Sequence, residues 1–163
     1  MIKIILEDDR EINIDLFEEV APETVANFKN LVENNYYDGV IFHRIIPHFV
    51  IQTGGFTIKD NEIVMKEHVK PIHGEFLANG FDNKLPHTKG VVSMARTNEF
   101  NSASSQFFIC VEDCPHLDGN YAAFGKVKDD SSMAIAVELS EAPRDYRDFP
   151  LYPVMIKKVI IVD

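Results

Sequence analysis

Cysteine is scarce in this chain, and the two that occur form neither a redox motif nor a metal site. The 163 residues include only Cys110 and Cys114. Their spacing differs from the C-x-x-C of thiol–disulfide enzymes, and two thiols alone cannot complete a four-ligand zinc site. We therefore expect both cysteines to stay reduced, as in proteins of a reducing intracellular compartment.

Basic charge is also limited. The sequence has 16 lysines and arginines against 26 aspartates and glutamates, so its net charge is −10. An acidic surface repels the phosphates of nucleic acids and of anionic membranes. We therefore expect neither a nucleic acid nor a membrane as a partner.

Long apolar runs are missing as well. No segment reaches the roughly 18 apolar residues of a membrane-spanning helix. The segment from Met1 to Asp8 has no small-residue cleavage site, and it predicts a first strand rather than a signal peptide. The expected localisation is the cytoplasm.

The sequence also lacks the motifs of three enzyme classes. Its six histidines show no H-E-x-x-H spacing, Gly54-Gly55 lacks the G-x-x-x-x-G-K spacing of a phosphate loop, and no serine lies in a G-x-S-x-G elbow. We expect no metal and no cofactor, and we expect the two glycines to serve a turn or a bulge. A serine hydrolase remains as an alternative, and it would use one of Ser93, Ser102, Ser104 and Ser105.

The overall composition is that of a globular protein. Hydrophobic residues make up 45% of the sequence and charged residues 26%. A domain of this length buries roughly 70% of the surface of its unfolded chain, which provides a core without disulfides or metals. No repeat or linker interrupts the sequence, so we expect a single domain over residues 1–163.

Short apolar runs bounded by turn residues predict a mainly β protein. Strands are expected over residues 2–6, 12–17, 42–52, 63–65, 74–77, 91–95, 106–111, 121–127 and 155–162. Apolar residues at helical spacing and capping residues predict helices over 22–32 and 131–139. About eight short strands with two helices predict a closed β-barrel.

An unusual strand-like segment runs from Phe42 to Gln52, with the sequence F-H-R-I-I-P-H-F-V-I-Q. Arg44 lies among apolar residues, Gln52 ends the run, and aromatic rings lie on both sides. Burying a guanidinium without a partner is costly. We therefore expect the polar residues to converge on a concave apolar surface, which would bind a largely apolar ligand with one carbonyl or amide group.

Three sequence blocks carry a family resemblance. They are F-H-R-I-I-P-H-F-V-I-Q-T-G-G at 42–55, S-M-A-R-T at 93–97, and S-S-Q-F-F-I at 104–109 followed by L-D-G at 117–119. Over nearly its whole length the sequence resembles the cyclophilins, the peptidyl-prolyl cis-trans isomerases inhibited by cyclosporin, and its P-H-L-D-G and A-A-F-G-K-V segments resemble bacterial members. The resemblance implies a closed eight-stranded antiparallel β-barrel capped by two α-helices, with a substrate groove on its outer face.

The resemblance also implies roles for individual residues. Arg44 would be the catalytic arginine, and Gln52 would hold the substrate backbone and orient Arg44. The catalytic residues Phe49 and Phe108 would form the pocket for the proline ring together with Val50 and Leu117. Residues before the proline would bind along Ala95, Arg96, Thr97 and Gln106, and the far rim would consist of His116 and Tyr121.

Four positions depart from the pattern that is familiar in eukaryotic cyclophilins. Val50 replaces a common methionine, and Tyr121 replaces a histidine. Arg96 replaces an asparagine and is expected to contact the peptide only through its backbone. His116 replaces a tryptophan that grips cyclosporin, so we expect this drug to bind weakly.

Arginine suits the chemistry that the resemblance implies. Rotation about an X–Pro bond is slow because amide resonance sets a barrier near ~20 kcal/mol. The twisted transition state has a lone pair on a pyramidal nitrogen, which a charged donor such as Arg44 binds better than the planar amide. We expect proline-containing peptides and unfolded proteins as partners, and we expect a monomer. The alternative is a proline-peptide binding module with incidental catalysis, although an intact Arg44–Gln52 pair favours the enzyme.

Overall fold

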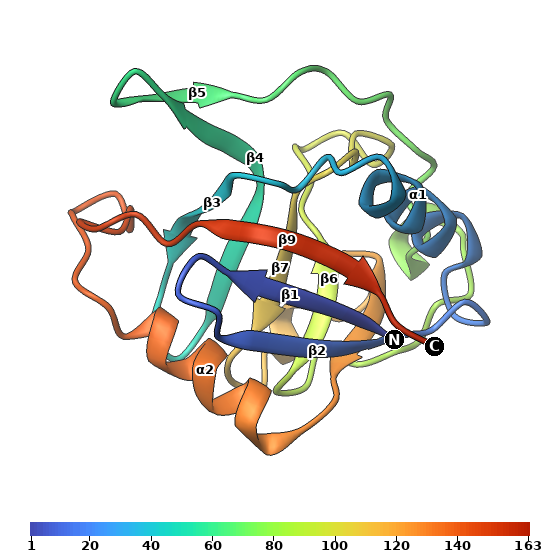
Figure 1. The fold of residues 1–163 in the computed structure, drawn as a ribbon. Helices are drawn as coiled ribbons and strands as arrows, with labels where there is room; N and C mark the ends of the chain where they lie inside the picture. The colour runs from blue at the N-terminus through green and yellow to red at the C-terminus, as the bar shows by residue number, and fades with distance from the viewer.

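The computed structural model describes all 163 residues and contains nine β-strands and two α-helices (Figure 1). The strands are β1 (Ile2–Leu6), β2 (Glu11–Leu16), β3 (Val40–Ile45), β4 (Val50–Lys59), β5 (Glu62–Met65), β6 (Val91–Met94), β7 (Phe107–Cys110), β8 (Ala123–Val127) and β9 (Ile156–Ile161). The helices are α1 (Pro22–Glu33) and α2 (Asp130–Ser140), and short 3₁₀ turns cover Leu77–Asn79 and Pro115–Leu117. Neither α-helix has the length and apolar character needed to cross a membrane.

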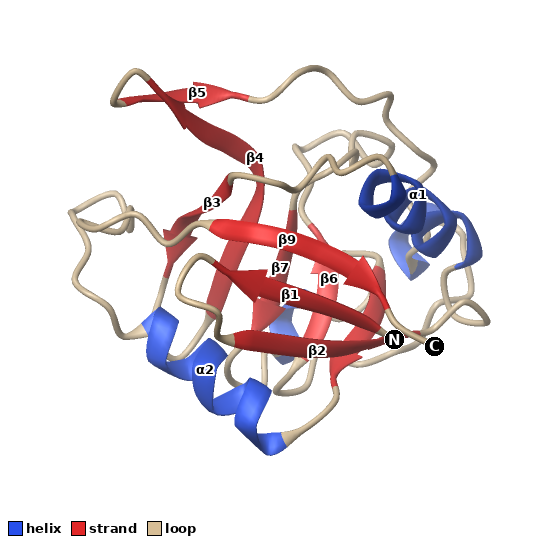
Figure 2. Ribbon diagram, viewed as in Figure 1, coloured by secondary structure: helices blue, strands red, loops and turns tan.

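Eight of the strands form a nearly closed antiparallel barrel in the order β3-β4-β7-β6-β8-β2-β1-β9. Its two edges, β3 and β9, approach through a bridge between Ile41 and Met155, and the Gly39 N–H donates to the Ile156 carbonyl over 2.8 Å. Figure 2 shows α1 and α2 lying against different sides of the strands. The expected mainly β barrel with two helices is confirmed.

The first hairpin shows how the sequence pattern builds the core. Ile2, Ile4 and Leu6 of β1 are buried and alternate with less buried residues, because successive side chains of a strand point to opposite faces. Strand β2 repeats the pattern with Ile12 and Ile14. All five belong to the main hydrophobic core of 30 residues. The predicted hairpin is confirmed.

Helix α1 follows the predicted spacing, but its first turn is capped from a distant loop. Phe28 and Leu31 bury its apolar face. The buried Glu75 carboxylate accepts hydrogen bonds from the Thr24 N–H over 2.7 Å and from the Thr24 hydroxyl over 2.6 Å. A carboxylate at this position satisfies free N–H groups and complements the positive end of the helix dipole.

Helix α2 has a local cap and begins one residue earlier than its sequence-based prediction. Asp129 accepts a hydrogen bond from the Ser132 N–H over 2.8 Å and another from the Asn13 amide over 3.1 Å. These bonds from Ser132 and Asn13 hold the pKa of the Asp129 carboxyl well below its usual range. The same cap therefore ties α2 to β2.

Two of the predicted strands are wrong. The segment 42–52 is not one strand, because a tight turn at 46–49 separates β3 from β4. In this turn Pro47 cannot donate to a ladder, and His48 takes a φ of 63°. Residues 74–77 form no strand, since the chain turns into the 3₁₀ segment that Gly80 ends with a φ of 81°.

Strand β4 runs beyond the barrel and forms a projecting hairpin with β5 (Figure 1). Asp60 and Asn61 make its two-residue turn with φ values of 51° and 64°. Two positive φ values in a two-residue hairpin turn match the twist of the flanking strands. The strand predicted at 63–65 is confirmed by β5.

Gly54 and Gly55 form a bulge in β4, as expected. The pairing with β3 shifts there, since Val40 lies opposite Thr57 and Phe42 opposite Thr53. Gly54 has a φ of 106°, and a Cβ atom on it would lie 2.5 Å from the Ser105 carbonyl oxygen. Only glycine therefore allows β4 to approach the chain leading into β7.

Candidate active site

Residues from the sequence blocks meet on the outer face of the barrel. Strand pairing places Arg44 of β3 opposite Gln52 of β4, and Gln52 opposite Phe108 of β7. Side chains at directly paired positions point to the same face of a sheet. Phe107 and Ile109, the neighbours of Phe108, belong to the main core, so this row points away from it.

A small cavity, here called the apolar slot, opens beside this row. Its volume is about 140 Å³, and it is lined by Arg44, Phe49, Val50, Gln52, Ala95, Arg96, Phe108, Leu117 and Tyr121. Its wall belongs to a second hydrophobic cluster of Val50, Phe108, Cys110, Cys114 and Leu117. The Tyr121 ring meets the Phe108 ring edge-on at 5.7 Å. This shape suits a small apolar ring that carries a polar group.

A second cavity, here called the polar cavity, adjoins the apolar slot. Its volume is about 220 Å³, and it is lined by Gln52, Ala95, Arg96, Thr97, Ser102, Ser104 and Gln106. Three lining residues, Gln52, Ala95 and Arg96, are shared with the slot, so one extended ligand would cross both.

His116 is the one predicted site residue that lines neither cavity. Its exposed ring packs 5.4 Å from the Phe49 ring, which places it on the rim of the slot.

A larger hollow lies elsewhere and contains none of the predicted residues. It has a volume of about 830 Å³ and runs along α2, where its lining includes Arg10, Met133, Val137, Glu138 and Tyr152. We call it the α2 hollow.

The Arg44 side chain is exposed and forms no ion pair or hydrogen bond within the protein. The resemblance implied that Gln52 orients it, but no such hydrogen bond is present. The Gln52 amide instead donates to the Gln106 side-chain oxygen over 3.1 Å and lies 3.5 Å from His43 Nε2. The Arg44 guanidinium is therefore free to donate to a ligand.

His43 is neutral at physiological pH. Burial, followed by the positive charge of Arg44, lowers the pKa of His43 from 6.5 to about 4. Its ring also packs edge-on against Phe56, with 4.7 Å between the ring centres. Arg44 therefore supplies the positive charge at this end of the slot. The half-buried His43 stays neutral and packs behind Gln52.

Arg96 lines both cavities. The resemblance implied that only its backbone contacts a peptide, and this stays a prediction. Its guanidinium carbon lies 4.8 Å from the ring centres of Phe76 and Tyr121 and 5.1 Å from that of Phe100. A second cation is therefore fixed between the apolar slot and the polar cavity.

A serine, a histidine and an aspartate lie close together behind the slot, an arrangement that the sequence did not reveal. His87 Nε2 lies 2.9 Å from the Ser93 hydroxyl oxygen, and His87 Nδ1 lies 3.3 Å from Asp118 Oδ1 in a poorly aligned contact. Ser93 is 0% exposed, so its hydroxyl cannot attack a substrate. The His87 ring stacks 6.2 Å from the Phe108 ring. This array supports the slot wall, and the serine hydrolase alternative finds no nucleophile in it.

The cysteines also lie behind the slot. Both are free thiols, and burial raises the pKa of each. The neutral thiols act as small apolar residues in the second cluster and not as nucleophiles.

Comparisons with known proteins agree with this geometry. The family model described as cyclophilin type peptidyl-prolyl cis-trans isomerase/CLD matches residues 1–161. A peptidyl-prolyl cis-trans isomerase of Acinetobacter baylyi is 39% identical, over 92% of this chain and 79% of that protein. One from Streptomyces antibioticus is 37% identical, over 93% of this chain and 92% of that protein.

Solved structures give the same result. A cyclophilin type peptidyl-prolyl cis-trans isomerase of Cryptosporidium parvum, crystallised in the presence of the dipeptide Ala-Pro, matches with a TM-score of 0.80. It is 27% identical, and the match covers 99% of this chain and 98% of that one. The sequence blocks, the barrel and these matches lead to the same assignment: the chain belongs to the family of cyclophilin-type peptidyl-prolyl cis-trans isomerases.

Proposed function

We propose that Arg44 is the catalytic residue of this isomerase and that the apolar slot holds the proline ring. The observation that carries this proposal is the unpaired Arg44 guanidinium at the edge of a slot lined by Phe49, Phe108 and Leu117. The slot fixes one side of the X–Pro bond, while the acyl side extends toward the polar cavity and rotates.

Arg44 acts by binding the twisted amide more tightly than the planar one. Twisting removes resonance and leaves a lone pair on the proline nitrogen, which accepts a hydrogen bond only in the transition state. An interaction that is stronger in the transition state than in the ground state raises the rate. Arginine keeps its charge at every physiological pH and so needs no proton transfer.

Arg44 alone does not supply the whole effect. One hydrogen bond to a charged group is worth about 1.5–3 kcal/mol, whereas a ~10⁶-fold acceleration needs about 8 kcal/mol. The rest comes from holding the ring in place and from partial exclusion of water, which strengthens the Arg44 contact. The ring is held and water is excluded by the side chains of Phe49, Val50, Phe108 and Leu117.

Gln52 and Gln106 hold the peptide backbone in this proposal. Their mutual hydrogen bond of 3.1 Å fixes both amides before the substrate arrives. The side-chain oxygen of Gln52 remains available to accept a hydrogen bond from a peptide N–H. Gln52 therefore positions the substrate, whereas Arg44 contacts the reacting nitrogen.

The proposed substrates are X–Pro bonds in unfolded chains and exposed loops. The Ala-Pro dipeptide named for the Cryptosporidium parvum structure supports this class of ligand. We further propose a cytoplasmic monomer that binds cyclosporin weakly, since His116 at the rim offers less contact area than an indole ring.

A protease-coupled assay on an X–Pro peptide tests the role of Arg44. Arg44→Ala should lower kcat/KM by about 10- to 100-fold, the loss of one hydrogen bond to a charged group. Its free energy of unfolding should stay within about 0.5 kcal/mol of wild type, because the side chain is exposed. Arg147→Ala, on the exposed loop before β9, is the matched control and should retain full activity. Comparable turnover by Arg44→Ala and wild type would refute the proposal.

A further inference from the structure

We propose that Arg96 makes this isomerase selective for peptides with a carboxylate side chain shortly before the proline. The inference rests on the proposed seat of the proline ring in the apolar slot, and it names the substrate class that the neighbouring cavity takes. Arg96 is thereby a specificity-determining residue.

The charges that line the two cavities all have one sign. Arg44 and Arg96 are the only charged lining residues of the apolar slot and the polar cavity, and no aspartate or glutamate lines either of them. The chain as a whole carries a net charge of −10. A pair of cations in an otherwise acidic molecule creates a local potential that attracts an anionic group.

Neither cation is neutralised within the protein. Nine close contacts join basic and acidic side chains, two of them through histidines, and none includes Arg44 or Arg96. A peptide carboxylate would therefore meet two cations that no carboxylate of the protein already pairs with. Arg44 is committed to the imide nitrogen, which leaves Arg96 for a side chain of the peptide.

Arg96 is fixed before a ligand arrives. Its Nε and Nη2 donate to the Asn120 carbonyl oxygen over 3.0 and 2.7 Å, and Nη1 donates to the Thr97 carbonyl oxygen over 2.9 Å. The rings of Phe76, Phe100 and Tyr121 surround the guanidinium. A guanidinium has five N–H donors, so two remain for a ligand. Because the side chain is already ordered, binding costs little of the entropy that a mobile surface arginine would lose.

The polar cavity offers further donors for a carboxylate. Its lining includes the hydroxyl groups of Thr97, Ser102 and Ser104 and the amides of Gln52 and Gln106. Its volume of about 220 Å³ accommodates an aspartate or glutamate side chain. In the proposed mode of binding the acyl side of the X–Pro bond extends from the apolar slot toward this cavity, which shares Gln52, Ala95 and Arg96 with the slot, so the carboxylate belongs to a residue shortly before the proline.

The test uses matched peptides in a protease-free exchange assay by NMR. The peptides differ only in having Glu, Gln or Lys at the second or third residue before the proline. Wild type should turn over the Glu peptide about two- to fivefold faster than the Gln peptide in kcat/KM at low salt, as a partly exposed ion pair allows. The Lys peptide should be slowest. These differences should vanish at about 1 M salt, where charges are screened within ~3 Å.

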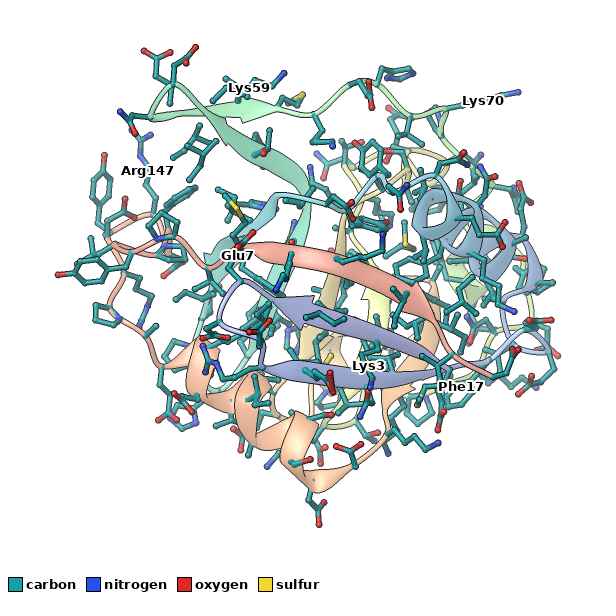
Figure 3. All side chains as sticks on the ribbon, viewed as in Figure 1. Lys3, Glu7, Phe17, Lys59, Lys70 and Arg147 are labelled. Carbon is teal, nitrogen blue, oxygen red and sulfur yellow. The ribbon has the colours of Figure 1, made fainter.

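Three variants separate Arg96 from other sources of selectivity. Arg96→Gln should bring the Glu-to-Gln ratio to one, although it lowers turnover of both peptides because Arg96 also supports the groove. Arg96→Lys keeps the charge and should retain part of the ratio. Arg147→Gln removes the same charge from the loop between α2 and β9, where Figure 3 shows Arg147, and should leave the ratio unchanged.

Two outcomes overturn the inference while leaving the isomerase mechanism intact. One is equal turnover of the Glu and Gln peptides by wild type at low salt. The other is an unchanged ratio in Arg96→Gln. In both cases the Gln peptide is still isomerised, so the seat of the proline in the slot stands. If wild type turned over none of the peptides, the proposed substrate class and this inference would both be refuted.

Discussion

The α2 hollow is larger than the apolar slot, but the slot has the chemistry that a binding site needs. The hollow has about 830 Å³ and the slot about 140 Å³. The charged residues of the hollow have both signs, and Arg10 is already paired with Glu138 at 3.3 Å. The slot instead holds two unpaired cations beside a compact apolar wall. Convergent and uncompensated chemistry, and not volume, is therefore what favours the slot as the proposed site.

The largest effect should separate the two regions directly. Phe108→Ala removes the slot wall and should lower kcat/KM by about 100-fold, because a loosely held ring loses its productive geometry. It should also lower the free energy of unfolding by about 3 kcal/mol, since Phe108 is buried. Val137→Ala shortens a side chain that lines the hollow. It should lower the free energy of unfolding by about 1 kcal/mol or less without changing kcat/KM. Urea unfolding and the X–Pro assay measure both. Equal losses of activity would remove the distinction between the regions.

Low pH should destabilise the protein through His43, which lies beside the slot residues Arg44 and Gln52. The pKa of His43 is lowered to about 4, so between pH 6.5 and 4 the unfolded chain binds a proton that the folded chain does not. The free energy of unfolding should therefore fall as the pH falls through this window, by up to about 3 kcal/mol from His43. Burial lowers the pKa of His87 as well, which adds a loss of the same sign.

Urea unfolding between pH 7 and pH 4 checks this prediction. His43→Gln should flatten the pH dependence by the contribution of one proton, whereas His73→Gln, at an exposed position, should not. No histidine lines the α2 hollow, so that region should not contribute. An identical slope in wild type and His43→Gln would contradict the prediction.

The smallest effect concerns the rim. His116→Trp should tighten cyclosporin binding by about three- to tenfold in titration calorimetry, because an indole buries more apolar area than an imidazole. Tyr152→Trp places the same side chain beside the α2 hollow and should change nothing. Equal affinities of wild type and His116→Trp would show that the rim does not limit binding.

Local signals in the sequence were sufficient to predict most strands and both helices of the barrel. Alternation in residues 2–6 and helical spacing in residues 22–32 depend on near neighbours, and both predictions hold. Because Arg44, Gln52 and Phe108 lie in family-specific blocks, their placement on one face could be expected as well.

Contacts between residues far apart in the sequence could not be predicted. Glu75 caps α1 from 51 residues beyond Thr24, and Gln52 pairs with Gln106 across 54 residues. His87 and Asp118 are brought together by a loop and a 3₁₀ turn that have no periodic pattern. The two-residue shift in register at the Gly54–Gly55 bulge likewise appears only once β3 and β4 are paired.

The projecting β4–β5 hairpin offers an attachment site for a label or a tag. Its tip at Asp60 and Asn61 is exposed and lies beyond the glycine bulge, and Figure 3 shows the adjacent Lys59 well away from the barrel. Exposed loop tips tolerate insertions better than other sites. A fluorophore or an affinity tag joined there would allow immobilised or single-molecule assays in which the label lies away from the barrel.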